Sequence, residues 1–170
     1  MKRLWLSLSL VASCTSFSLS GYQDPLPGYG AATVDERAQI MSVVEDYYLV
    51  RTQAIAAGDA AVLYVRYPLL ATAEDRARGV NTDAWFIERM KAIRVKTVRV
   101  QIEAAEPMRV FVKNDAAVAY VHGRDDWIES GTASELYTRI DLRRMEGRWT
   151  IERTDEVMQS EWPPPPTPRG

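Results

Sequence analysis

The sequence of 170 residues has a single cysteine, Cys14, and a single histidine, His122. One cysteine cannot form a disulfide bond within the chain. Metal sites built from several histidine or cysteine ligands are excluded too, although a site built from carboxylates is not. We therefore expect no bound metal and no cofactor.

An excess of basic residues is also missing, because the formal net charge is -2. Binding to nucleic acid needs a concentrated basic surface, so we expect no nucleic-acid partner. Hydrophobic residues make up 46% of the chain and charged residues 26%, which is typical of a folded globular protein. The length suits one domain of ordinary size with additional segments.

Long apolar runs are absent as well, and a short one lies at the N-terminus. Residues 1–13 read MKRLWLSLSLVAS, with Lys2 and Arg3 ahead of an apolar run from Leu4 to Ala12. This is the pattern of a signal peptide for export, and it is shorter than the roughly 20 residues that span a bilayer. We expect the segment to direct export and to take no part in the fold.

The residues before Cys14 carry a more specific signal. A branched apolar residue and two small residues, Val11 to Ser13, precede the cysteine, and this resembles the bacterial lipoprotein signal. The resemblance implies cleavage before Cys14, acylation of that residue, and a lipid anchor in a membrane of the bacterial cell envelope. The alternative is an ordinary signal peptide cut after residues 18–20, which would give a secreted or periplasmic protein.

Composition divides the remaining chain into three parts. Residues 14–33 are rich in Ser, Gly and Pro without any period, which predicts a flexible tether. Residues 34–158 are expected to form one domain. Residues 159–170 contain four consecutive prolines and are expected to form a disordered tail. The alternative for the tail is a ligand for an aromatic-lined groove on a partner.

The first part of the domain has the apolar period of helices. A stripe at spacings of three and four predicts a long helix, capped by Asp35 and ended by Gly58, and Arg51 lies off this stripe. Asp59 is expected to cap a second helix over residues 60–66. A third helix is expected to begin at residues 81–83 and to end near Ile93. Its buried side is predicted to carry Trp85, Phe86, Met90 and Ile93.

From Lys96 onward the apolar period changes from 3.6 to 2, which predicts strands. Turns are expected at residues 113–115, 130–131 and 146–147, where Asn, Asp, Ser and Gly gather. The strand between the first two turns is a long one. Polar residues at alternate positions indicate an antiparallel sheet with one solvated face. Helices followed by a run of strands predict an α+β fold.

Two short segments give this order of elements a family resemblance. The residues Ala-Gly-Asp-Ala at 57–60 follow the long helix, and Gly-Arg-Trp-Thr-Ile at 147–151 lead into the last strand. The chain from about 35 to 157 is similar in this order to the nuclear-transport-factor-2-like superfamily, which includes SnoaL-like cyclases and ketosteroid isomerases. The resemblance implies a cone: three N-terminal helices on a bent antiparallel sheet of four to six strands, enclosing a pocket. It also implies a homodimer formed through the sheet.

The isomerase mechanism does not carry over. In that family a tyrosine stands about two turns before the Ala-Gly-Asp sequence, whereas Arg51 occupies this position here. Tyr47 and Tyr48 lie a further turn back. The long helix is therefore expected to cover the sheet and not to carry an active site.

His122, Arg124 and Asp126 form the densest group of polar residues and share one face of a predicted strand. His122 as a base and Asp126 as its orienting carboxylate would suit acid–base chemistry. The alternative is that Arg124 and Asp126 pair on a solvated sheet face.

Large amphipathic side chains could instead line an apolar pocket. They either ring a cavity or fill the core of the cone. These candidates are Tyr47, Tyr64, Trp85, Tyr120 and Tyr137.

Three functions stay open at this point. We favour an exported, lipid-anchored, non-enzymatic domain that binds a small apolar ligand or a protein partner. A small isomerase or cyclase using His122 and Asp126 is the second possibility. A dimeric assembly module without a pocket is the third.

Overall fold

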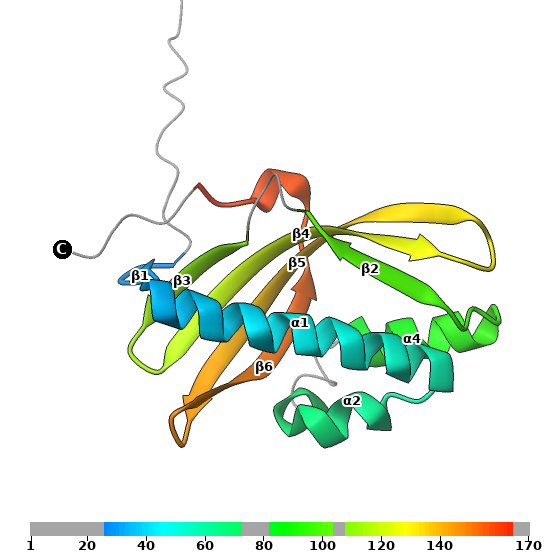
Figure 1. Ribbon diagram of the computed structural model, residues 1–170, viewed down its shortest axis with the longest axis horizontal. Helices are drawn as coiled ribbons and strands as arrows, with labels where there is room; N and C mark the ends of the chain where they lie inside the picture. Colours follow the sequence, from blue (N-terminus) through cyan, green and yellow to red (C-terminus); the bar gives the residue numbers. More distant parts are fainter. Residues whose placement is uncertain (1–25, 73–81, 104–107, 165–170) are drawn as a thin grey trace, which may run out of the picture.

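The computed structural model describes residues 26–72, 82–103 and 108–164. In these residues three α-helices pack on a six-stranded antiparallel sheet (Figure 1). The helices are α1 (Val34–Ala57), α2 (Ala61–Arg66) and α4 (Thr82–Ala92), with two 3-10 turns, η1 (Pro68–Ala71) and η2 (Gln159–Glu161). The strands are β1 (Gly30–Ala31), β2 (Val98–Ile102), β3 (Arg109–Lys113), β4 (Ala116–Trp127), β5 (Thr132–Met145) and β6 (Arg148–Glu156).

Strand β4 is the centre of the sheet. Both β2 and β3 pair with the same edge of β4, one after the other along its length, and β5 pairs with the opposite edge. The β2 backbone comes very close at Gly123, where an added Cβ would lie 2.6 Å from the Gln101 carbonyl oxygen. The outermost strands are β1, on β3, and β6, on β5. The predicted α+β fold, its three helices and its antiparallel sheet are confirmed.

Helix α1 lies across the sheet, with α2 and α4 near its C-terminal end (Figure 1). Its N-terminal cap lies two residues before Asp35, the residue that was expected to cap it. Thr33 caps it instead: the Thr33 hydroxyl accepts from the Glu36 amide, and the Glu36 carboxylate accepts from the Thr33 amide. Gly58 ends the helix at φ 63°, as predicted.

The two faces of the sheet have separate sets of apolar side chains. On the inner face, toward α1, odd-numbered residues of β4 such as Val121 join the main core. On the outer face, even-numbered residues such as Tyr120 form a smaller cluster with Leu26, Phe111 and Val118. Because side chains alternate along a strand, neighbouring residues of β4 face opposite environments.

A β-bulge interrupts this alternation in β6. Leu142 of β5 pairs with Ile151, but the preceding residue Asp141 pairs with Arg153, so Glu152 is an extra residue on β6. Ile151 and Thr154 are consequently both buried, although they are three positions apart. Simple alternation from Trp149 and Ile151 would have placed Arg153 inside.

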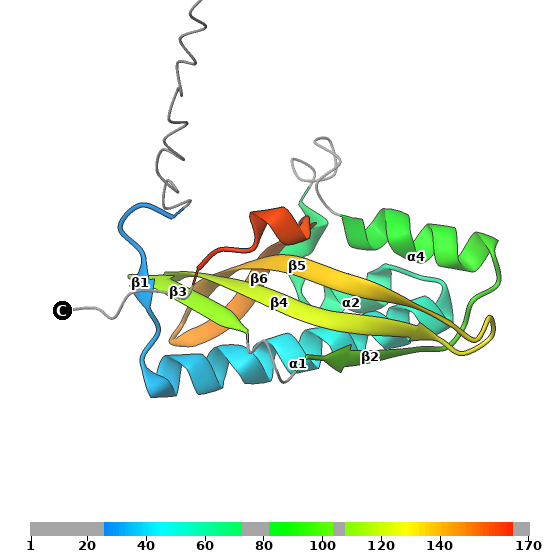
Figure 2. The same ribbon diagram turned by 90° about the horizontal axis from the view of Figure 1, so that it is seen from above.

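Segments at both ends of the domain pack on the sheet. Leu26 and β1 both belong to residues 14–33, which were expected to form a flexible tether. Leu26 joins the outer-face cluster, and β1 pairs with β3. Within the range expected to form a disordered tail, residues 159–161 form the turn η2, on the side of the sheet opposite α1 (Figure 2). Trp162 packs against the outer-face cluster. The homodimer through the sheet stays a prediction, and Trp162 covers part of the face that it would use.

Candidate functional site

A cavity of about 700 Å³ opens between α4 and the turn that joins β4 to β5. Its wall is mainly aromatic and aliphatic, with a few charged side chains at the rim. The lining residues are Trp85, Phe86, Arg89, Met90, Ile93, Val95, Trp127, Glu129, Ser130, Thr132 and Glu156. Pockets for small organic ligands commonly have this size and this mixture of many apolar groups with few polar ones.

The orientation of α4 differs from the prediction and explains why the cavity stays open. Trp85 and Ile93 were expected on the buried side, but they are 63% and 60% exposed. The buried side of α4 consists of Asp83, Ile87 and Met90. With Asp83 turned inward, the helix presents Trp85 and Ile93 to the cavity and to solvent instead of to the core.

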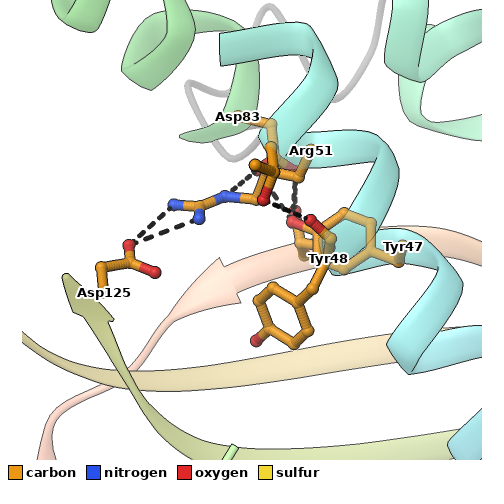
Figure 3. Close-up of polar contacts among 7 residues, drawn as sticks. Tyr47, Tyr48, Arg51, Asp83 and Asp125 are labelled. Atoms are coloured by element: carbon orange, nitrogen blue, oxygen red, sulfur yellow. Dashed lines mark hydrogen bonds and ion pairs between the residues drawn. The ribbon is translucent and has the colours of Figure 1, made fainter. Parts of the chain in front are cut away.

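Arg51 lies at the centre of a buried polar network behind this cavity (Figure 3). Its side chain was expected off the buried stripe of α1, yet the residue is only 4% exposed. The Arg51 Nε lies 3.4 Å from Asp83 Oδ1, and Nη1 and Nη2 lie 3.3 and 3.4 Å from Asp125 Oδ2. Burial alone would lower the pKa of Arg51, but its electrostatic interactions with Tyr47, Asp125 and Asp83 outweigh burial and raise it.

The two carboxylates of the network differ in how well they are bonded. The Tyr47 hydroxyl lies 2.8 Å from each oxygen of Asp83, and the Thr154 hydroxyl donates to Asp83 Oδ2 at 2.7 Å. Asp125 is bonded to Arg51 through Oδ2 (Figure 3), whereas its Oδ1 is buried without a hydrogen-bond partner among the described residues. Burial raises the pKa of Asp125, although Arg51 acts in the opposite direction.

Phe86 separates the cavity from the network. One face of its ring carries the Arg51 guanidinium at 4.5 Å, and its centroid lies 5.6 Å from that of Trp127. Both aromatic residues line the cavity. Trp127 and Asp125 are two positions apart on β4 and so share its inner face, about 7 Å apart along the strand.

The predicted catalytic residues lie on the opposite, outer face of β4. His122 Nε2 lies 2.7 Å from Glu135 Oε2, and Asp126 accepts from Arg124 Nε at 2.6 Å. The structure therefore brings Arg124 and Asp126 together but does not bring His122 to Asp126. Four residues of strand separate those two by about 13 Å.

The predicted pocket residues do not ring one cavity. Tyr47 is buried in the polar network, and Tyr64 packs at the edge of the main core. Tyr120 and Tyr137 lie on the outer face, 5.9 and 5.7 Å from the Trp162 ring. Trp85 lines the cavity described above.

A second cavity, of about 780 Å³, lies between α1 and the β5–β6 turn. Its wall is more polar, and its charged groups are partly paired, since Arg66 Nε donates to Asp46 Oδ2 at 2.7 Å. It lacks the cluster of aromatic rings that lines the first cavity. We therefore regard the first cavity as the better ligand site.

Sequence reasoning missed Arg51, Asp83 and Asp125 as a group. Asp83 was considered as a helix cap, and Asp125 only as a neighbour of His122. The one signal in the sequence was Arg51 itself, an arginine beside the apolar stripe with two tyrosines one turn earlier.

Two kinds of feature are absent from the described residues. No group of three or more His, Cys, Asp or Glu side chains in this part of the chain could hold a metal ion. None of the helices in residues 26–72, 82–103 and 108–164 is long and apolar enough to span a membrane.

No protein-family model and no curated protein matches the sequence. The structure is similar to that of an NTF2-like protein with a cystatin-like fold from Novosphingobium aromaticivorans. The two sequences are 20% identical, the alignment covers 75% of this chain and 84% of the other, and the TM-score is 0.48. Since fold does not determine function, no activity is transferred. The helices and strands described above have the α+β arrangement, helices packed on one antiparallel sheet, that their order in the sequence predicts.

Proposed function

We propose that this domain binds a small apolar molecule in the cavity between α4 and the β4–β5 turn. The observation that supports the proposal is the lining of this cavity of about 700 Å³, which includes the rings of Trp85, Phe86 and Trp127. Burial of an apolar ligand against these rings would contribute about 25 cal/mol for each Å² removed from water.

The positions of the predicted catalytic residues support a binding role for the domain better than they support acid–base catalysis. His122, Arg124 and Asp126 lie on the face of β4 that points away from the cavity, and each has a hydrogen-bond partner there. A group that acts on a ligand must come within hydrogen-bond distance of it. A ligand in the cavity would not reach these three side chains, so the proposed role is non-enzymatic.

The proposed setting is the bacterial cell envelope, with the domain held by a lipid on Cys14. This part of the proposal rests on residues 1–14 of the sequence, which lie outside the described residues. Intact-mass measurement of the protein from a bacterial host tests it. We expect the mass of a chain that starts at Cys14 and carries acyl groups, and a Cys14→Ser variant without them. A mature chain starting after residues 18–20 would contradict the anchor.

Ligand binding is tested with 2-methylnaphthalene as an apolar probe, followed by calorimetry and tryptophan fluorescence. We expect saturable binding to the wild type and loss of binding in Thr132→Trp, since Thr132 lines the cavity and is exposed. The control is Ser42→Trp, which places the same ring in the second cavity. Absence of binding to the folded wild type would overturn the proposal, as would loss of binding in the Ser42 variant alone.

A further inference from the structure

The buried network has an unequal distribution of charge. Arg51 is the sole cation in direct contact with Asp83 and Asp125 among the described residues, so the network carries one more negative charge than positive. Asp83 also receives hydrogen bonds from Tyr47 and Thr154. From the described residues Asp125 receives only the two long bonds from Arg51, at 3.3 and 3.4 Å. The uncompensated charge therefore belongs mainly to Asp125.

Burying a carboxylate oxygen without a donor is costly, because the oxygen has lost its water and gained no partner. Asp125 is 3% exposed, and its Oδ1 is such an oxygen. A donor that reached Oδ1 would remove this cost, and a cationic donor would also balance the network. Arg51 would not repel that cation strongly, because Asp83 offsets its charge.

The cavity is connected to Asp125 through a short series of contacts. Its lining includes the Phe86 ring, which contacts both Trp127 and the Arg51 guanidinium. The same guanidinium binds Asp125, which lies two positions along β4 from Trp127. A rotation of the Phe86 side chain would connect the cavity with Asp125 and leave both strands in place.

The wall of the cavity also suits a cation. Aromatic faces attract ammonium groups, and the Arg89 guanidinium already lies 5.2 Å from the Trp85 ring centroid. The charged side chains of the wall are Arg89, Glu129 and Glu156, so acidic groups are in excess here as well.

We propose that the ligand of this cavity is an apolar primary amine in its protonated form, whose ammonium group passes Phe86 and donates to Asp125 Oδ1. This inference rests on the proposed function, since it names the chemical class of the ligand of the same cavity. Asp83 holds Arg51 in place, and Asp125 is the group that meets the ligand.

Four probes with one ring system and different polar groups test the inference at neutral pH: 2-naphthylmethylamine, 2-naphthylmethanol, 2-naphthoate and 2-methylnaphthalene. A primary amine is protonated at neutral pH, as a lysine side chain is. We expect the amine to bind about tenfold to a hundredfold more tightly than the alcohol, which is the range for a charged hydrogen bond. We expect the carboxylate to bind most weakly.

The outcomes separate the two proposals. Binding of methylnaphthalene without any preference for the amine would overturn the inference and leave the proposed function standing. Failure of all four probes would overturn both. Tighter binding of the carboxylate than of the amine would overturn the inference alone.

Variants identify the residue that is responsible for the preference for the amine over the alcohol. Asp125→Asn is expected to reduce the ratio of amine to alcohol affinity to about one, by removing the energy of the charged hydrogen bond. The matched control is Asp126→Asn, the same change one residue along β4 on the outer face, and it should leave the ratio unchanged. Loss of the preference in the Asp126 variant, or its retention in the Asp125 variant, would overturn the inference.

Phe86→Ala provides a second variant that keeps Asp125, in case Asp125→Asn does not fold. Removal of the ring opens the wall without touching the charges of the network. We expect the amine preference to increase at least severalfold, because the ring no longer has to move aside. An unchanged or smaller preference in the folded variant would overturn the inference.

Discussion

At the scale of single residues, Arg51 is the side chain on which the interior depends most. Arg51→Met keeps the volume but leaves Asp83 and Asp125 buried without their cation. We expect a loss of about 3–5 kcal/mol in the free energy of unfolding, measured by denaturant titration. Arg66→Met is the control, because its pair with Asp46 is exposed and should contribute less than about 1 kcal/mol. Equal losses in both variants would contradict the central role of Arg51.

The pH dependence of stability should show opposite signs at two aspartates. Burial raises the pKa of Asp125 in the folded state, so its stabilising contribution is present below the unfolded pKa and lost as pH rises through the folded one. Burial also acts to raise the pKa of Asp46, but hydrogen bonds from Arg66 and Tyr67 outweigh it and lower the pKa. Its contribution is present above the unfolded pKa and is lost as pH falls.

Unfolding of Asp125→Asn, Asp46→Asn and the wild type at several acidic pH values checks this prediction. Relative to the wild type, Asp125→Asn should gain stability as pH rises through the acidic range, and Asp46→Asn should lose it. Parallel profiles for the two variants would contradict the assignment.

At the scale of the elements, the C-terminal segment has a structural role. Trp162 packs on Tyr120, and the Arg109 guanidinium lies 5.4 Å from the Trp162 ring centroid. Trp162→Ala should reduce the free energy of unfolding by about 1–3 kcal/mol, because an aromatic contact and its buried area are lost. Met158→Ala is the control in the same segment, since Met158 is exposed. Faster hydrogen exchange in β3 and β4 of the Trp162 variant would locate the effect, and unchanged exchange would contradict it.

The sequence predicted the elements well where local rules decide them. Gly58, the turn at Asn114 and the turn at Glu146 and Gly147 all lie where a left-handed residue is needed. The predicted buried side of α4 was right at Met90 but wrong at Trp85 and Ile93, because apolar side chains were expected inside and the charged Asp83 outside. Burial of Asp83 becomes favourable through partners on other elements, which are Arg51, Tyr47 and Thr154. Such pairing across the fold has no local signature.

At the scale of the whole molecule, the α+β fold class could be predicted from the sequence, but the side chains that face the interior could not. The change of apolar period at Lys96 separates helices from strands, and this order suffices for the α+β class. The candidate site depends on which side of β4 is covered by α1, and alternation alone does not decide that. From the sequence His122 was the candidate site residue and Asp125 only its neighbour, whereas the structure buries Asp125.

The bulge in β6 has a consequence for which genetic changes this protein tolerates. Glu152 has its only described partner in Arg143 at the surface, so its replacement by alanine should cost less than about 1 kcal/mol. Deletion of the same codon would remove the bulge and leave Arg153 opposite Asp141 and Thr154 opposite Ile140, so Thr154 would still face Asp83. We expect the deletion variant to have a midpoint of thermal unfolding close to that of Glu152→Ala, and a much lower midpoint would contradict this. Both the identity of this residue and its presence are thus free to change during evolution.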